Sequence, residues 1–200
     1  MPDYRRRLPH VFKTDKPVFL TCRLHGSLPS NRYFRPGTLT AGQQFVAMDR
    51  ILDAGRTGPL YMKDARIADL VVDAIQHAEE SLKHFELHAY VVMPNHVHML
   101  VTPRTSLPLL LKSLKSITAK RGNELLGLTG TPFWQDESYD RNVRNREEFA
   151  RIRRYIEMNP VNAGLARSAE EYEWSSARTA IGGSPADQGV RPPLLKKLRG

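Results

Sequence analysis

Residues 90–101 (YVVMPNHVHMLV) contain two histidines, His96 and His98, in an otherwise apolar run, and this feature constrains the fold most. Side chains alternate between the two faces of a β-strand, so both histidines point to one face while the apolar residues between and after them point to the other. Two neutral imidazoles side by side on a strand suit a divalent metal ion. The alternative is that one or both histidines pair with backbone groups beside a core. The spacing favours a metal pair.

The histidines stand at the start of the second strand of an antiparallel hairpin over 85–102, because Pro94-Asn95 is a turn signal after a strong strand pattern. Hydrophobic periodicity predicts a first strand over Val18–Leu24 and amphipathic helices over 63–83 and 106–125. A short fourth strand is predicted to begin at Phe133–Gln135. A last helix is predicted over 146–159, capped by Asn145 together with Glu148 and ended by Pro160.

The order strand, helix, strand, strand, helix, strand predicts an α+β fold, a ferredoxin-like antiparallel sheet with a helical layer on one face. The extra C-terminal helix would cover the other face, to which His96 and His98 would point. The fold class is therefore a ferredoxin-like sheet sandwiched by helices, and the extra helix carries Tyr155.

The chain of 200 residues with 40% hydrophobic content suits one medium domain with appendages. We expect a basic N-terminal arm over 1–15, a domain over 16–180 and a flexible basic tail over 181–200. Within the domain, the Gly-, Pro-, Ser- and Asn-rich residues 26–59 are expected to form a variable insert with one short helix. The net charge is +9, and residues 1–13 and 181–200 each contribute +3. Such basic arms suit a polyanion such as nucleic acid, although they also aid solubility.

Cys22 is the single cysteine, so the sequence predicts neither an internal disulfide nor a cysteine-based zinc site. No apolar run approaches the roughly 20 residues that cross a bilayer, and the basic N-terminus has no apolar signal segment. We expect a cytoplasmic protein with no membrane partner and no disulfide partner.

Tyr155 and Asn159 are spaced i, i+4 in the last predicted helix, which places them on one helical face. If this face lies against the histidine strand, His96, His98 and Asn159 would hold one cation, with Tyr155 one turn away. Mg²⁺ or Mn²⁺ fits such a set best, since Zn²⁺ rarely uses a neutral amide. The alternative makes Tyr155 an ordinary boundary aromatic and Asn159 a helix-terminal residue before proline.

The string VMPNHVH over 92–98 resembles the two-histidine motif of the HUH single-strand nucleases. More narrowly, FWQ at 133–135, Tyr139-Asp140, Arg144 and YIEMNPV at 155–161 resemble the REP-associated tyrosine transposases, relatives of the single-tyrosine insertion-sequence transposases. The resemblance covers residues 17–25 and 60–178. By this likeness Tyr155 matches the nucleophile, His96 and His98 match the metal pair, and Asn159 matches a third ligand that varies in the wider family.

The resemblance implies metal-assisted cleavage and rejoining of single-stranded DNA near a hairpin-forming palindromic repeat. Tyr155 would form a 5′-phosphotyrosine and leave a free 3′-hydroxyl. Backbone phosphates would be held by five arginines in particular: Arg5, Arg6, Arg7, Arg144 and Arg154.

Two other functions stay open at this point. One is a binding module that keeps the fold but does not cut structured nucleic acid. The other is a metal-dependent phosphohydrolase that uses activated water and in which Tyr155 is structural.

Overall fold

The computed structural model describes residues 16–29 and 41–179. The predicted N-terminal arm and C-terminal tail, and with them Arg5, Arg6 and Arg7, lie outside the described residues. The elements in chain order are β1 (Val18–Arg23), α1 (Ala41–Asp53), a 3₁₀ turn (Tyr61–Lys63), α2 (Ala65–Glu80), β2 (Phe85–Val92), β3 (His96–Pro103), α3 (Leu107–Leu126), β4 (Tyr139–Asn142), α4 (Arg146–Asn162) and α5 (Ser176–Thr179).

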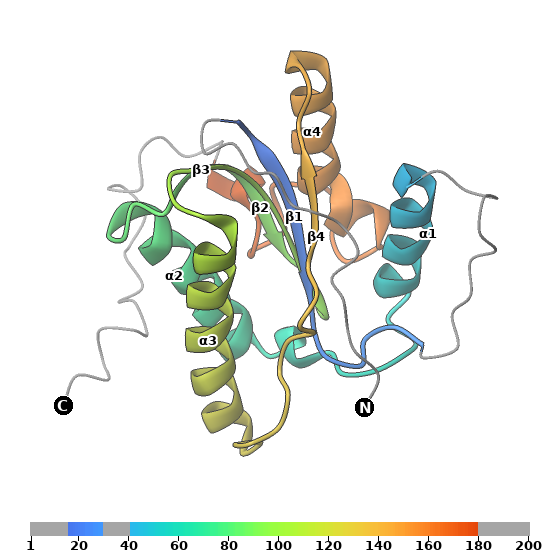
Figure 1. The fold of residues 1–200 in the computed structure, drawn as a ribbon. Coiled ribbons are helices and arrows are strands. Elements are labelled where there is room, and N and C mark those ends of the chain that lie inside the picture. Colours follow the sequence, from blue (N-terminus) through green and yellow to red (C-terminus); the bar gives the residue numbers. More distant parts are fainter. Residues whose placement is uncertain (1–15, 30–40, 180–200) are drawn as a thin grey trace.

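The four strands form one antiparallel sheet in the order β2-β3-β1-β4 (Figure 1). This arrangement confirms the predicted ferredoxin-like fold. The histidine strand β3 lies inside the sheet, between β2 and β1, and Thr21 of β1 is the register partner of His98. A one-residue slip of this register would turn both histidines to the opposite face, so burial of the two sheet faces fixes their direction.

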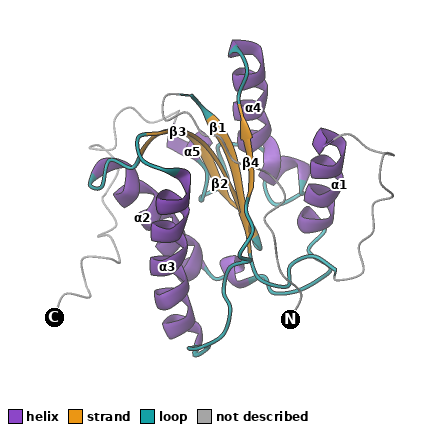
Figure 2. Ribbon diagram, in the orientation of Figure 1, coloured by secondary structure: helices purple, strands orange, loops and turns teal. Residues whose placement is uncertain are grey.

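The two faces of the sheet carry separate hydrophobic cores. Alternate residues of β1 and β3, among them Leu20, Val97 and Met99, pack with α2 and α3. The intervening residues, among them Phe19 and Leu100, pack with Ile156 of α4 and Phe45 of α1. Figure 2 shows the strands between these two groups of helices. The predicted alternation is confirmed, and the histidines belong to the α4 face.

The helix in the predicted insert, α1, occupies 41–53, and its Phe45 and Leu52 are buried. The backbone therefore passes over the α4 face before it enters α2. Residues 26–29 form a loop after β1, and residues 54–59 form a loop after α1.

The fourth strand was predicted at the wrong place. β4 covers Tyr139–Asn142, whereas Trp134 makes only an isolated bridge to Leu24. Phe133 and Trp134 are buried, and the Trp134 Nε1 donates to the Thr118 hydroxyl of α3 at 2.8 Å. Aromatic residues are typical of strands, but these two serve as core anchors beneath α3 instead.

Helix α4 begins as predicted and ends later than predicted. The Asn145 side chain accepts from the Glu148 backbone N–H at 2.8 Å, while the Glu148 carboxylate accepts from the N–H of Arg144 rather than that of Asn145. Pro160 does not end the helix, which continues to Asn162. Proline lacks only its own N–H, and the last turn retains the bond from Ala163 N–H to the Asn159 carbonyl at 3.0 Å.

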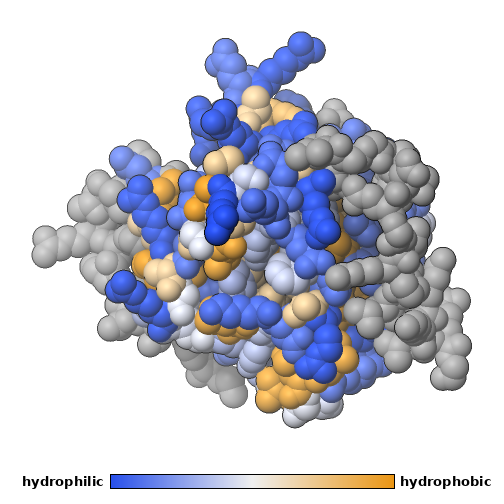
Figure 3. Space-filling model, turned by 180° about the vertical axis from the view of Figure 1, so that it is seen from behind, coloured by the Kyte–Doolittle hydropathy of each residue, from blue (hydrophilic) through white to orange (hydrophobic). Residues whose placement is uncertain are grey.

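The surface seen from behind is mostly hydrophilic, with scattered hydrophobic residues (Figure 3). Exposed large hydrophobic residues among those described, such as Leu109 and Leu125 of α3, stand singly along the sequence. Among the described helices, none is long and apolar enough to cross a membrane.

The cap of α4 gives a first prediction. Asn145→Ala should lower the free energy of unfolding by about 1 kcal/mol, because the first turn of α4 loses a side-chain acceptor. Chemical denaturation measures the change. Asn145→Asp retains an acceptor and should stay close to the parent, as should Asn162→Ala at the exposed helix end. Equal stability of Asn145→Ala and the parent would contradict the role of this cap.

Candidate active site

His96 and His98 lie side by side on β3 and are completely buried, each with 0% of its surface exposed. Their ring centroids are 4.6 Å apart. Both point to the face that α4 and α1 cover, as the strand pattern predicts.

The Nδ1 atom of each histidine has a hydrogen-bond partner next to the strand. The His96 Nδ1 lies 2.7 Å from the Asn95 Oδ1, an acceptor, so this nitrogen carries the proton and donates. The His98 Nδ1 lies 2.8 Å from the Thr21 hydroxyl, which can accept from this nitrogen or donate to it. The Nε2 atoms of both rings have no hydrogen-bond partner and face the Asp49 carboxylate. Such outer hydrogen bonds are what orient histidine ligands in metal sites.

Asp49 of α1 is the residue that the sequence reasoning missed. Its Oδ1 lies 3.0 Å from the His98 Nε2 and 3.8 Å from the His96 Nε2, and the residue is 2% exposed. The three side chains form a group able to hold a metal ion. A cation between these atoms would contact all three side chains.

Five buried polar atoms of this cluster have no hydrogen-bond partner: Oδ1 of Asp49, Oδ1 of Asp53, Nε2 of His96, Nε2 of His98 and Oδ1 of Asn159. A buried polar atom without a partner is costly, so five of them together call for a common partner. Nitrogen and oxygen donors of this kind fit Mn²⁺ or Mg²⁺, and the residues present therefore fit a divalent cation.

The ionisation of the cluster follows from burial and charge. Burial and the neighbouring His98 lower the pKa of His96 to about 3, so its imidazole is neutral and able to ligate. Burial and the adjacent Asp49 carboxylate raise the pKa of Asp53 to about 7. Burial also acts to raise the pKa of Asp49, but His98, His96 and a hydrogen bond from Asn159 outweigh it, and the net shift is downward.

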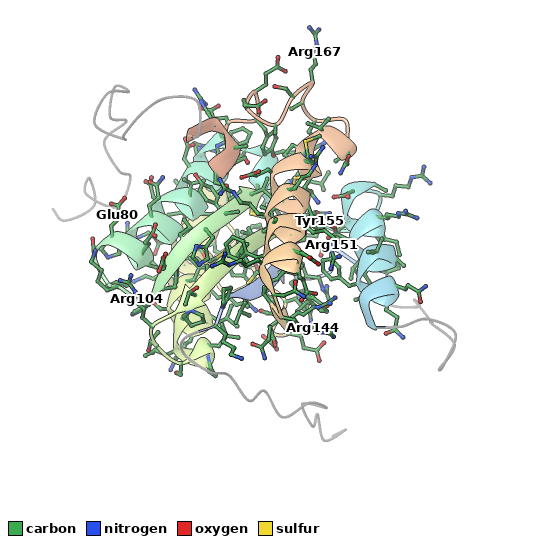
Figure 4. All side chains as sticks on the ribbon, turned by 90° about the horizontal axis from the view of Figure 1, so that it is seen from above. Glu80, Arg104, Arg144, Arg151, Tyr155 and Arg167 are labelled. Atoms are coloured by element: carbon green, nitrogen blue, oxygen red, sulfur yellow. The ribbon has the colours of Figure 1, made fainter. Side chains whose placement is uncertain are left out.

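Tyr155 of α4 reaches the same carboxylate from the other side. Its hydroxyl donates to the Asp49 Oδ2, and the Asn159 Nδ2 lies 3.4 Å from that oxygen. The Tyr155 ring centroid is 5.7 Å from that of His98. The structure therefore brings the Tyr155–Asn159 face against the histidine strand, which was the condition set by the sequence reasoning. Figure 4 shows Tyr155 on α4, with α1 beside this helix.

The other two tyrosines of the C-terminal half have different surroundings. The Tyr172 hydroxyl donates to the Val92 carbonyl at 3.0 Å, a structural bond across the core. The Tyr139 ring stacks on Phe45 with centroids 4.4 Å apart. Of these three tyrosines, only Tyr155 has its hydroxyl bonded to the carboxylate of the cluster.

Arg144, which lies just before α4, and Arg154, in the middle of this helix, are both exposed. A cavity of about 150 Å³ at this end is lined by Arg141, Arg144, Asn145, Glu147, Glu148 and Arg151. Buried Glu148 pairs with Arg141 inside it. Arg144, Arg151 and Tyr155 follow one another along the helix in Figure 4. The predicted role of Arg144 and Arg154 at DNA phosphates stays a prediction.

The sequence offered one signal for Asp49 and Asp53. They are spaced i, i+4, with Asp49 inside the apolar stretch 45–52 and Asp53 directly after it, so they share a helical face. Nothing in that spacing states which strand the face meets.

Residues 62–159 match the family model described as IS200-like transposase, and the match contains His96, His98, Tyr155 and Asn159. This match supports a transposase-like role in processing DNA for the chain.

Solved structures show where the fold recurs. The structure of a REP-associated tyrosine transposase bound to a REP hairpin matches with a TM-score of 0.57 and 19% identity, over 95% of this chain and 92% of that chain. The two proteins share a fold, which together with the family match confirms the predicted resemblance. A crystal structure from Deinococcus radiodurans R1 aligns with a TM-score of 0.41 and 18% identity, over 76% of this chain and 97% of that chain. The comparison with curated proteins found no match.

The hydrogen bond behind His98 gives a second prediction. Thr21→Val keeps the shape of the side chain but removes the hydrogen-bond partner of the His98 Nδ1, so the ring loses the contact that orients it. Binding of Mn²⁺ should weaken about tenfold or more, as measured by titration calorimetry.

Thr102→Val is the matched control. Thr102 lies on β3, the strand of His98, and its hydroxyl is 2.7 Å from the Nε2 of His88, a histidine outside the cluster. This variant should bind Mn²⁺ like the parent. If both variants bind Mn²⁺ equally well, the hydrogen bond between Thr21 and His98 does not contribute to metal binding.

Proposed function

We propose that the chain cleaves and rejoins single-stranded DNA near hairpin-forming palindromic repeats, with Tyr155 as nucleophile and a 5′-phosphotyrosine as intermediate. One observation carries the proposal. The Asp49 carboxylate accepts from the Tyr155 hydroxyl through one oxygen and faces the Nε2 atoms of His96 and His98 with the other. A structural tyrosine has no need of a buried carboxylate and two imidazoles whose Nε2 atoms lack a hydrogen-bond partner.

The chemistry assigns one task to each group of the chain. The Tyr155 oxygen forms a bond to phosphorus, and the bond from phosphorus to the 3′ oxygen breaks. The tyrosine proton moves to the Asp49 Oδ2, which already accepts it as a hydrogen bond, and the 3′ oxygen leaves as a hydroxyl after it takes up a proton. The phosphodiester to tyrosine preserves the bond energy, so a new 3′-hydroxyl reverses the step and joins another strand.

The metal pair is proposed to be His96 and His98, with Asn159 as a third ligand. A divalent cation there, Mg²⁺ or Mn²⁺, would neutralise charge on the non-bridging phosphate oxygens. The fully buried Asn159 supports this role, since its Oδ1 has no hydrogen-bond partner.

The DNA partner is proposed from the family and the fold. The similar REP-associated transposase is described as bound to a REP hairpin, and a hairpin with an unpaired flank is the substrate we propose for this chain. Arg144 and Arg154 on α4, and Arg5, Arg6 and Arg7 before β1, would hold backbone phosphates. Binding should then weaken with added salt, since each neutralised phosphate releases a counterion.

Tyr155→Phe tests the nucleophile. The change removes one oxygen and keeps the ring, so the fold and the binding of hairpin DNA should persist, while the covalent adduct should disappear. Incubation with a labelled hairpin-bearing single strand and Mn²⁺, followed by denaturing electrophoresis, measures the adduct.

Tyr139→Phe and Tyr172→Phe are the controls and should both retain the adduct. Tyr172→Phe should lower thermal stability, because it loses a buried bond to the Val92 carbonyl. An adduct on Tyr155→Phe would refute the assignment. Hydrolysis without any adduct would point to a phosphohydrolase, and binding without cleavage would point to a binding module.

A further inference from the structure

Helix α1 lies outside the residues that match the transposase family, which begin at Met62. Even so, it contributes two carboxylates to the histidine cluster. Asp49 and Asp53 stand one helical turn apart on the face of α1 that meets β3. The family match alone assigns nothing to this helix.

A single amide joins the end of α1 to the histidine strand. The Asn95 Nδ2 donates to the Leu52 carbonyl of α1 at 2.9 Å, while the Asn95 Oδ1 accepts from the His96 Nδ1. Leu52 is 4% exposed and anchors the same turn in the core. The carboxylate of Asp53, the next residue, is therefore held beside the His96 ring.

The candidate ligand atoms of the cluster lie close enough together to share one ion. Ligands about 2.0–2.1 Å from a cation lie roughly 3 Å apart when adjacent and roughly 4 Å apart when opposite. The Asp49 Oδ1 lies 3.0 Å from the His98 Nε2 and 3.8 Å from the His96 Nε2. The Asp53 Oδ1 lies 3.8 Å from the His96 Nε2. The 3.0 Å separation is that of adjacent ligands, and both 3.8 Å separations are shorter than the roughly 4 Å that one ion spans.

The surroundings indicate a ligand rather than an ordinary acidic patch. The two Nε2 atoms belong to fully buried histidines, and neither has a hydrogen-bond partner. Oδ1 of Asp49 and Oδ1 of Asp53 are buried without a hydrogen-bond partner as well. Two like charges side by side in a buried place are unfavourable unless a cation joins them.

We propose that α1 is a metal-binding element and that Asp53 joins Asp49, His96 and His98 as a ligand of one divalent cation. Two carboxylates and two neutral imidazoles give a set with two negative charges, which a hard divalent ion such as Mn²⁺ balances. The proposal rests on the metal site of the proposed function and extends it to a residue outside the family match.

Asp53→Asn tests the proposal on the full chain without DNA. The substitution keeps the size of the side chain but removes its charge, and Asp53 has no contact with Tyr155 among the described interactions. The dissociation constant for Mn²⁺, from titration calorimetry and from electron paramagnetic resonance of the free ion, should rise at least about tenfold. The rise in melting temperature on addition of Mn²⁺ should shrink in parallel.

Three further variants complete the design: the control Asp136→Asn, the ligand variant His96→Ala and a second change at the tested position, Asp53→Ala. Asp136 is an exposed acid in the loop before β4, so its variant loses the same charge and should bind Mn²⁺ like the parent. His96→Ala should lose most of the binding. Without metal, Asp53→Asn should melt no lower than the parent, because it removes the neighbour that repels Asp49. Asp53→Ala is the second variant and should weaken binding as Asp53→Asn does.

The outcomes separate the two proposals. If His96→Ala loses binding while both Asp53 variants stay within about twofold of the parent, Asp53 is not a ligand and the metal pair of the proposed function stands. If His96→Ala also binds like the parent, or if the parent itself binds no Mn²⁺, the metal site of the proposed function falls as well.

Discussion

The carboxylate of Asp49 is the interaction on which the site depends, because it joins three elements that are distant in the sequence. One oxygen faces the histidine nitrogens of β3, and the other accepts from the Tyr155 hydroxyl of α4. Without this group, the proposed nucleophile and the proposed metal ligands would share no described hydrogen bond or ion pair. Through the two oxygens of Asp49, the Tyr155 hydroxyl is connected to the cluster that would bind the metal ion.

The sheet provides the rigid part of this arrangement. Thr21 and Asn95 hold the outer nitrogens of the two histidines, and the antiparallel register of β1 on β3 places Thr21 beside His98. Helix α1 covers this site so closely that neither histidine has exposed surface.

The sequence predicted the parts of the site that depend on local periodicity. Alternation on a strand gave the shared direction of His96 and His98, and helical spacing gave the shared face of Tyr155 and Asn159. It did not predict Asp49. The Gly-, Pro-, Ser- and Asn-rich sequence around α1 has no clear periodicity, and the strand against which α1 packs depends on tertiary contacts. The same limit explains the fourth strand: Phe133 and Trp134 fit a strand and a core anchor equally well, and packing against α3 decided between them.

The central claim is that Tyr155 carries the DNA after cleavage, and peptide mapping of the trapped adduct tests it most directly. Cleavage after arginine and lysine places Tyr139, Tyr155 and Tyr172 in three separate peptides, since Arg141, Arg154 and Arg167 lie between or beside them. Mass spectrometry should find the added 5′-nucleotide on the peptide 155–167, whose single tyrosine is Tyr155. A nucleotide on either of the other two peptides, or complete cleavage of the strand with no modified peptide, would contradict the account.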